Sequence, residues 1–312
     1  MLGFALDQGT TLSWVLFLAF IGVMLALDLG VFHKKAHVPS FREALAWTSV
    51  WATLAAIFGG WLAWARGATP SIEFFTGYVI ELSLSMDNVF VFVVILGGLA
   101  IPKPLQHRVL FWGVLTALVL RGAMILGGAA LVARYHWVLY GFGAFLVWTG
   151  LKLLRSHDHH GDGAPKAEGR LLSFLRRKLR VTTLHEHRFL VRVDGQLRAT
   201  PLLLALLMVE VSDVVFAIDS IPAIFAVTQD PFLVFTANVF AILGLRSLFF
   251  VLSGMLDRFV YLKYGLAIVL TFVGLKLVLL DVVNVPSLLS LGVVLGVLGS
   301  AVGLSWFRSA HR

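Results

Sequence analysis

Nine apolar stretches, each about 20 residues long, limit the folds that this sequence can adopt. A helix of that length crosses the hydrocarbon core of a bilayer, which is about 30 Å thick. Apolar residues make up 59% of the 312 residues and charged residues 13%, which argues against a water-soluble domain. We therefore predict an all-α membrane protein. The stretches are residues 12–32, 44–64, 72–99, 109–132, 137–154, 202–227, 232–256, 260–280 and 288–307.

The loops between these stretches carry their lysine and arginine residues mainly on one side. Ten of them lie in the long polar loop at 155–199, whereas the loops predicted on the opposite side hold just Arg66 and Arg134. Basic loops stay in the cytoplasm, so we predict nine spans with the N-terminus outside and the C-terminus in the cytoplasm. No basic residue precedes the first stretch, which is therefore predicted to be a span rather than a signal peptide.

Composition also limits the function. The formal net charge is +8, but the basic residues lie between apolar stretches, where they set membrane orientation, and we expect a lipid bilayer and no nucleic acid as partner. The sequence has no cysteine, which excludes disulfides, thiolate metal sites and cysteine nucleophiles. It has no phosphate-binding loop of the ATPase type. We expect no enzyme, since the spacing of His185, Glu186 and His187 does not fit a zinc protease.

Three short motifs recur at a nearly constant distance of 124 to 126 residues. Residues 87–90 recur as 213–216, 120–121 as 245–246, and 150–153 as 274–277. Each copy holds three stretches, and an odd number of crossings turns the second copy over, so we predict an inverted 3+3 helix repeat. We divide the single membrane domain, 1–312, into peripheral helices (12–66), repeat 1 (72–154), a basic cytoplasmic loop (155–199), repeat 2 (202–280) and a final helix (288–307).

Acidic residues occur inside the apolar stretches, where a charge costs about 2.5 to 3.5 kcal/mol at the bilayer centre. Five of the six fall in stretches three and six, the first helices of the two repeats, and serine and asparagine side chains surround them. The acids are Asp28, Glu81, Asp87, Glu210, Asp213 and Asp219, and the neighbouring oxygen donors are Ser83, Ser85, Asn88, Ser212 and Ser220. Such a cluster predicts a cation site near the bilayer midplane.

An alternative is that the acids only pair with Arg121 and Arg246, the two arginines inside the stretches, and hold the helices together. Two arginines cannot neutralise five carboxylates, and a divalent cation or protons would fill the deficit. For Asp28, which lies close to a basic end, the two interpretations are equally good.

Helical geometry complicates a single site, because one straight helix cannot direct all of these donors to one side. Glu81 and Asn88 share a face of their helix, whereas Asp87 lies at least about 120° from Glu81. Pro222 also removes a backbone hydrogen bond from stretch six. An unwound or kinked centre in each helix would bring the donors together and would free carbonyl oxygens for an ion.

Carboxylate, hydroxyl and amide oxygens suit hard cations such as Mn²⁺, Mg²⁺ and Ca²⁺. We expect one of these divalent cations as the substrate, exchanged for protons because clustered carboxylates have coupled proton affinities, and no permanent cofactor. The run of His157, His159 and His160 could capture metal, but such polar runs are more often linkers, and a basic amphipathic segment follows it.

Three segments resemble the signature helices of the TerC/Alx family: residues 81–88, 210–213 and 216–223. The resemblance covers nearly the whole chain and includes residues 28–32, Asn238, residues 245–247 and residues 189–201. It implies a bacterial inner-membrane protein of a family that is named for tellurium resistance and associated with manganese efflux. It also implies metal-site roles for Glu81, Asp87, Asn88, Glu210, Asp213 and Asp219.

A second function is a membrane scaffold without transport, serving a tellurite stress-response or secretion complex through its basic loop. The acidic cluster favours transport over this alternative. The direction of transport and assembly into a homo-oligomer are left open by the sequence.

Overall fold

The computed structural model describes residues 11–30, 40–135, 137–155, 178, 181–182, 188–193, 196–252, 261–283 and 285–310. Helices make up most of this part, and two short strands form an antiparallel hairpin. The helices are α1 (Thr11–Gly30), α2 (Phe41–Arg66), α3 (Ala68–Gly98), α4 (Lys103–Arg134), α5 (Val138–Arg155), α7 (Pro201–Phe225), α8 (Pro231–Leu252), α9 (Leu262–Val278) and α10 (Ser287–Ala310); the strands are β1 (Leu190–Val193) and β2 (Gln196–Ala199).

Each predicted apolar stretch coincides with one of these helices. Within the described residues, six helices are long and apolar enough to cross a membrane, namely α2, α4, α5, α7, α8 and α10, and α1 and α9 contain shorter apolar segments. Helix α3, which carries Glu81 and Asp87, is not among the six. The all-α membrane class is therefore supported, while the number of nine spans stays a prediction.

Local sequence explains where several helices begin. Ser40 and Glu43 form a capping box at the start of α2, in which each side chain accepts a hydrogen bond from the other residue's backbone N–H. Helix α7 begins at Pro201, and α4 has Pro104 as its second residue; the missing N–H of a proline needs no partner in the first turn of a helix. Gly67 joins α2 to α3 with φ of 93°, a conformation that side chains disfavour.

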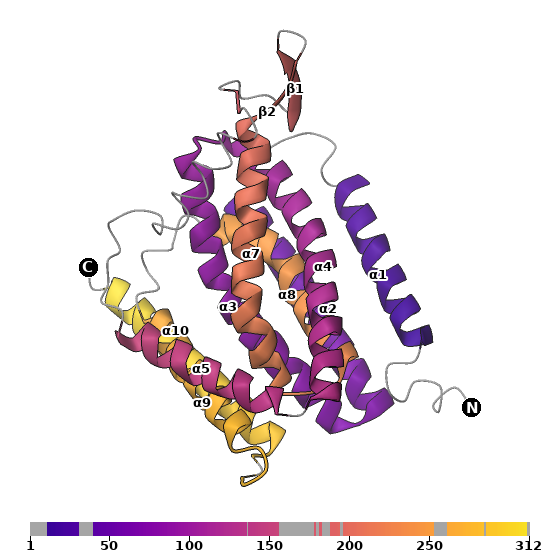
Figure 1. Ribbon diagram of the computed structural model, residues 1–312, viewed down its shortest axis with the longest axis vertical. Coiled ribbons are helices and arrows are strands. Elements are labelled where there is room, and N and C mark those ends of the chain that lie inside the picture. The colour runs from indigo at the N-terminus through magenta and orange to yellow at the C-terminus, as the bar shows by residue number, and fades with distance from the viewer. Residues whose placement is uncertain are drawn as a thin grey trace.

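Helices α3, α4, α7 and α8 form the centre of the bundle. Helix α3 packs against α7 and α8, and α4 packs against the same two helices. Helix α2 covers α3 and α8, and α1 stands at the edge (Figure 1). Helices α5, α9 and α10 form a group that runs obliquely beside this centre (Figure 1). The helix pairs that the predicted repeat relates, α3 and α7, α4 and α8, and α5 and α9, are all in contact.

The contact between α5 and α9 is close because glycines lie at the crossing. A Cβ atom added to Gly274 would lie 2.8 Å from the carbonyl oxygen of Gly143, and one added to Gly150 would lie 2.8 Å from that of Ala267. Position 274 matches 150 and position 267 matches 143 at the repeat offset of 124. If each residue is replaced by its counterpart in the other copy, one contact becomes the other, as an inverted repeat would require. The repeat itself stays a prediction.

This crossing gives a stability prediction. Gly143→Ala should destabilise the protein by about 1–3 kcal/mol, because the new methyl group meets backbone atoms of α9 that cannot move independently. Gly141→Ala on the same helix is the control, since nothing lies within 4 Å of its Cβ position. Thermal unfolding in detergent, followed by tryptophan fluorescence, compares the two; equal melting temperatures would contradict the close crossing.

The basic cytoplasmic loop predicted at 155–199 contains the hairpin of β1 and β2, which the sequence analysis did not predict. Val191 pairs with Arg198 in the middle of this hairpin. Phe189, just before β1, lies under the guanidinium of Arg108 at 5.3 Å, which attaches the hairpin to α4. The histidines His157, His159 and His160 lie outside the described residues.

Candidate functional site

Arg121 of α4 lies at the centre of the candidate site, between acids from two other helices. Its Nε and Nη2 atoms donate to the two carboxylate oxygens of Asp213 on α7, at 3.0 and 2.7 Å. Its Nη1 atom donates to Oε1 of Glu81 on α3. All three side chains are buried, with exposed fractions of 3% or less. One guanidinium thus connects the first helices of the two predicted repeats.

This arrangement supports part of the pairing alternative, since Glu81 and Asp213 do pair with Arg121. Bidentate arginine–carboxylate pairs are the stronger and geometrically more specific kind. The acids do not form separate ion pairs, however, because they share one cation. Among the described side chains, the three acids Glu81, Glu210 and Asp213 exceed Arg121 by two negative charges if all are ionised.

A cavity of about 170 Å³ lies on the Glu81 side of this cluster. Four of its lining residues have a buried side-chain oxygen with no hydrogen-bond partner among the described residues. These are Oε2 of Glu81, Oδ1 of Asn88, Oγ1 of Thr149 and Oγ of Ser220, which come from α3, α5 and α7. We call this space the oxygen-lined cavity. Buried polar atoms are rarely left without a partner, so the cavity is suited to a polar ligand.

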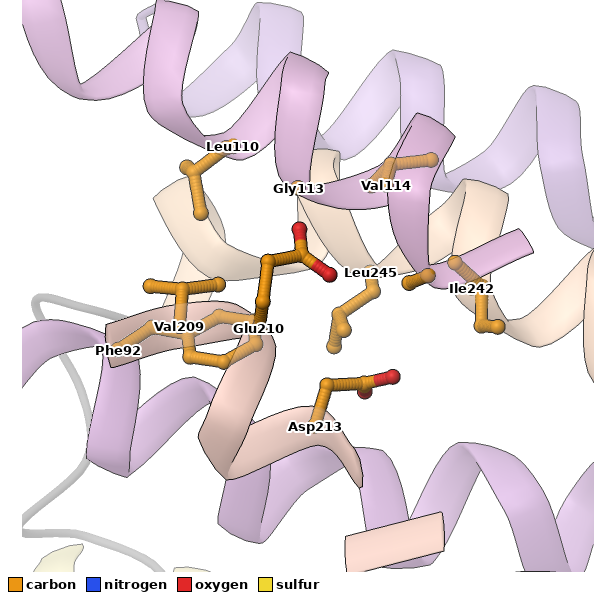
Figure 2. A pocket seen from close by; sticks show the side chains of 10 residues that line it. Phe92, Leu110, Gly113, Val114, Val209, Glu210, Asp213, Ile242 and Leu245 are labelled. Carbon is orange, nitrogen blue, oxygen red and sulfur yellow. The ribbon is translucent and has the colours of Figure 1, made fainter. Parts of the chain in front are cut away.

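A smaller cavity of about 20 Å³ lies on the other side, between α3, α4, α7 and α8. Glu210 and Asp213 project into it from successive turns of α7, and the Glu210 carboxylate points toward Gly113 of α4 (Figure 2). A Cβ atom added to Gly113 would lie 3.6 Å from Oε1 of Glu210. Neither oxygen of Glu210 has a hydrogen-bond partner among the described residues. We call this space the Glu210 cavity.

Neither of the two helices is unwound, since α3 and α7 are continuous over all their residues. Pro222 lies only three residues from the end of α7, where the lost hydrogen bond costs little. On α7, Glu210 and Asp213 line the Glu210 cavity, whereas Ser220 lines the oxygen-lined cavity. Donors on different sides of this helix therefore face two cavities without a break in the helix.

The other predicted residues divide into three groups. Ser83 and Ser212 donate to carbonyl oxygens of their own helices, at 2.7 Å to Val79 and 2.9 Å to Met208. Ser85 and Asn238 are buried, and Oγ of Ser85 and Nδ2 of Asn238 have no partner among the described residues, but neither residue lines the two cavities. The side chains outside the described part are those of Asp28, Asp87, Asp219 and Arg246.

Metal ligation by these residues is therefore untested. Among the described residues, no group of three or more His, Asp or Glu side chains is close enough to hold a metal ion. Asp87 and Asp219 are sequence neighbours of Asn88 and Ser220, which line the oxygen-lined cavity. The sequence analysis missed Thr149, whose only signal was a hydroxyl group within an apolar stretch, directly before the repeated residues 150–153.

Comparison with known protein families shows to which family this chain belongs. The profile of the integral membrane protein TerC family matches residues 66–312, which include both cavities and Arg121. The chain belongs to the TerC family. The resemblance found in the signature segments is thereby confirmed, and the protein is a multi-pass integral membrane protein of a family found in bacteria.

Several relatives of the TerC family are similar to this chain over almost their full length. The membrane protein STKORF319 of Myxococcus xanthus is 52% identical over 96% of this chain and 93% of that protein. A protein of Escherichia coli strain K12, named as the membrane-bound redox modulator Alx, is 46% identical over 93% of this chain and 92% of that protein. A membrane protein of Rickettsia bellii is 39% identical over 92% and 94%, respectively. No solved structure matches.

Proposed function

We propose that this TerC-family chain is a secondary transporter of a hard divalent cation, with Mn²⁺ as the substrate, exported across the bacterial inner membrane in exchange for protons. The N-terminus lies outside and the C-terminus lies in the cytoplasm. The cation binds in the oxygen-lined cavity during transport. The protein is a carrier rather than an enzyme in this proposal, and the metal is its cargo.

The observation that carries the proposal is the set of four unpartnered oxygens around one buried cavity. Glu81 supplies a carboxylate, Asn88 an amide oxygen, and Thr149 and Ser220 hydroxyl groups. Mn²⁺ and Mg²⁺ prefer such oxygen ligands and often keep some of their water. A volume of about 170 Å³ leaves room for an ion together with several water molecules.

The charge balance supports a divalent cation. Uncompensated buried charges are costly in the membrane. When ionised, the acids of stretches three and six outnumber the two arginines inside the stretches by three: Glu81, Asp87, Glu210, Asp213 and Asp219 against Arg121 and Arg246. A divalent cation reduces that excess, and so do protons. The same carboxylates can therefore hold either the metal or protons, which gives exchange a physical basis.

The name of the Escherichia coli relative, a redox modulator, suggests a different chemistry for that protein. These 312 residues contain no cysteine, so they offer no thiol for a redox reaction. The buried groups at the site are carboxylates, hydroxyl groups, an amide and a guanidinium. Ion binding fits these groups better than electron transfer does.

Flux measurements test this function. Purified protein in liposomes that contain a Mn²⁺-sensitive dye should admit Mn²⁺, and a proton gradient directed opposite to the metal should accelerate the flux several-fold. Liposomes without protein are the control. A flux that ignores the pH gradient would refute proton exchange, and no flux of any divalent cation would refute transport and favour a scaffold.

A further inference from the structure

Glu210 is a buried acid that does not line the oxygen-lined cavity, so the proposed cation site gives no reason for its burial. It lines the Glu210 cavity, and its surroundings there are mainly apolar side chains such as Phe92, Val209 and Leu245. Both of its carboxylate oxygens are without a hydrogen-bond partner among the described residues. A carboxyl group in such a place is either protonated or, when ionised, needs a cation or a hydrogen-bond donor as its partner.

Arg121 binds an acid that shares this cavity with Glu210. Asp213, which already accepts two hydrogen bonds from Arg121, also lines the Glu210 cavity. Glu210 lies three residues earlier on the same face of α7, a rise of about 4.5 Å along the helix. The guanidinium therefore binds one acid of the Glu210 cavity, and the other acid of that cavity, Glu210, has no hydrogen-bond partner among the described residues.

Two small residues of α4 line the Glu210 cavity on the same helix face as Arg121, beside the larger Leu110 and Val114. Gly113, Ala117 and Arg121 follow one another at intervals of four residues, so they share a face of the helix. Gly113 and Ala117 both line the Glu210 cavity. Long side chains on a helix lean toward its N-terminus, which for Arg121 is the direction of Ala117. The cavity of about 20 Å³ can hold a group the size of one water molecule, such as an NH₂ group of the guanidinium.

We propose that Arg121 exchanges one carboxylate for another during transport: when a divalent cation binds Glu81, the guanidinium leaves Glu81 and takes Glu210, while it keeps Asp213. This inference rests on the proposed function. Glu81 cannot serve the cation fully while the guanidinium occupies one of its oxygens. Glu210 is then a positioning residue, because it acts on the metal only through Arg121. The exchange also removes the ion pair that joins α3 to α4, which links ion binding to the contact between these helices.

A double-mutant cycle on Mn²⁺ affinity tests the exchange. Binding to the purified full-length chain is measured by the EPR signal of free Mn²⁺ for wild type, Glu210→Gln, Arg121→Gln and the double variant. Glu210→Gln should weaken binding by about tenfold when Arg121 is present, a usual size for coupling between sites, and should change nothing when Arg121 is absent. Equal weakening in both backgrounds would make Glu210 a direct metal ligand and overturn the inference.

A second variant keeps the test decisive if Arg121→Gln does not fold. Ala117→Val narrows the Glu210 cavity between Arg121 and Glu210 without changing any charge, and it should also weaken Mn²⁺ binding. Ala133→Val, at an exposed position of the same helix, is the matched control. Wild-type affinity in Ala117→Val would overturn the exchange. A wild-type protein that binds no Mn²⁺ would instead overturn the proposed function, and the inference with it.

Discussion

Glu81→Gln is expected to abolish cation transport and to leave the fold intact. The substitution keeps the shape of the side chain but removes the charge from the one described carboxylate in the oxygen-lined cavity. Arg121 keeps its two hydrogen bonds to Asp213, so the helices stay connected. Mn²⁺ flux into liposomes should fall by about 100-fold or more, since even supporting groups around a metal contribute factors of 10 to 100.

Glu73→Gln is the matched control for this experiment. Glu73 lies on the same helix, α3, and contacts Ser287 at 3.5 Å, away from both cavities. The control should transport Mn²⁺ at nearly the wild-type rate. If Glu81→Gln also transports at that rate, the cation does not use the oxygen-lined cavity.

Arg121→Met is expected to destabilise the protein by about 3–5 kcal/mol, the usual cost of removing one partner from a buried ion pair. The guanidinium satisfies two buried carboxylates from different helices, and both would lose their partner at once. The free energy of unfolding in detergent, obtained from denaturant titration, measures this loss. Arg134→Met is the control, because Arg134 is an exposed residue at the end of the same helix.

A rescue experiment separates charge from packing in this prediction. Neutralising both acids in the Arg121→Met background, as Glu81→Gln with Asp213→Asn, removes the uncompensated charges and should restore most of the stability. Unchanged low stability in that triple variant would mean that Arg121 acts mainly through its volume.

The positions of the helices could be predicted from the sequence because a helix that crosses a bilayer needs a stretch of about 20 apolar residues, and such stretches are visible in the sequence. The helices α2, α4 and α7, for example, begin and end within six residues of the predicted bounds. The hairpin of β1 and β2 was not predicted, since its two four-residue strands give almost no periodic signal.

The candidate site could be predicted only in part. Its acids were visible because charges in an apolar stretch are rare, and the repeat indicated that α3 and α7 meet. The sharing of Arg121 between Glu81 and Asp213 could not be read from the sequence, because these residues are far apart along it and depend on how three helices pack. Thr149 was missed because a threonine in an apolar helix commonly bonds its own backbone, so its hydroxyl group gave no sign of a role in a cavity.

The glycine crossing of α5 and α9 has a mechanical consequence. Backbones in such close contact cannot slide past each other without collisions, so the two helices should move as one rigid body. That body carries Thr149, Leu266 and Leu270 of the oxygen-lined cavity, whereas Glu81 and Ser220 belong to the central helices. A small tilt between the two bodies would therefore pull the walls of the cavity apart, and a thermal fluctuation of that kind could let an ion enter or leave.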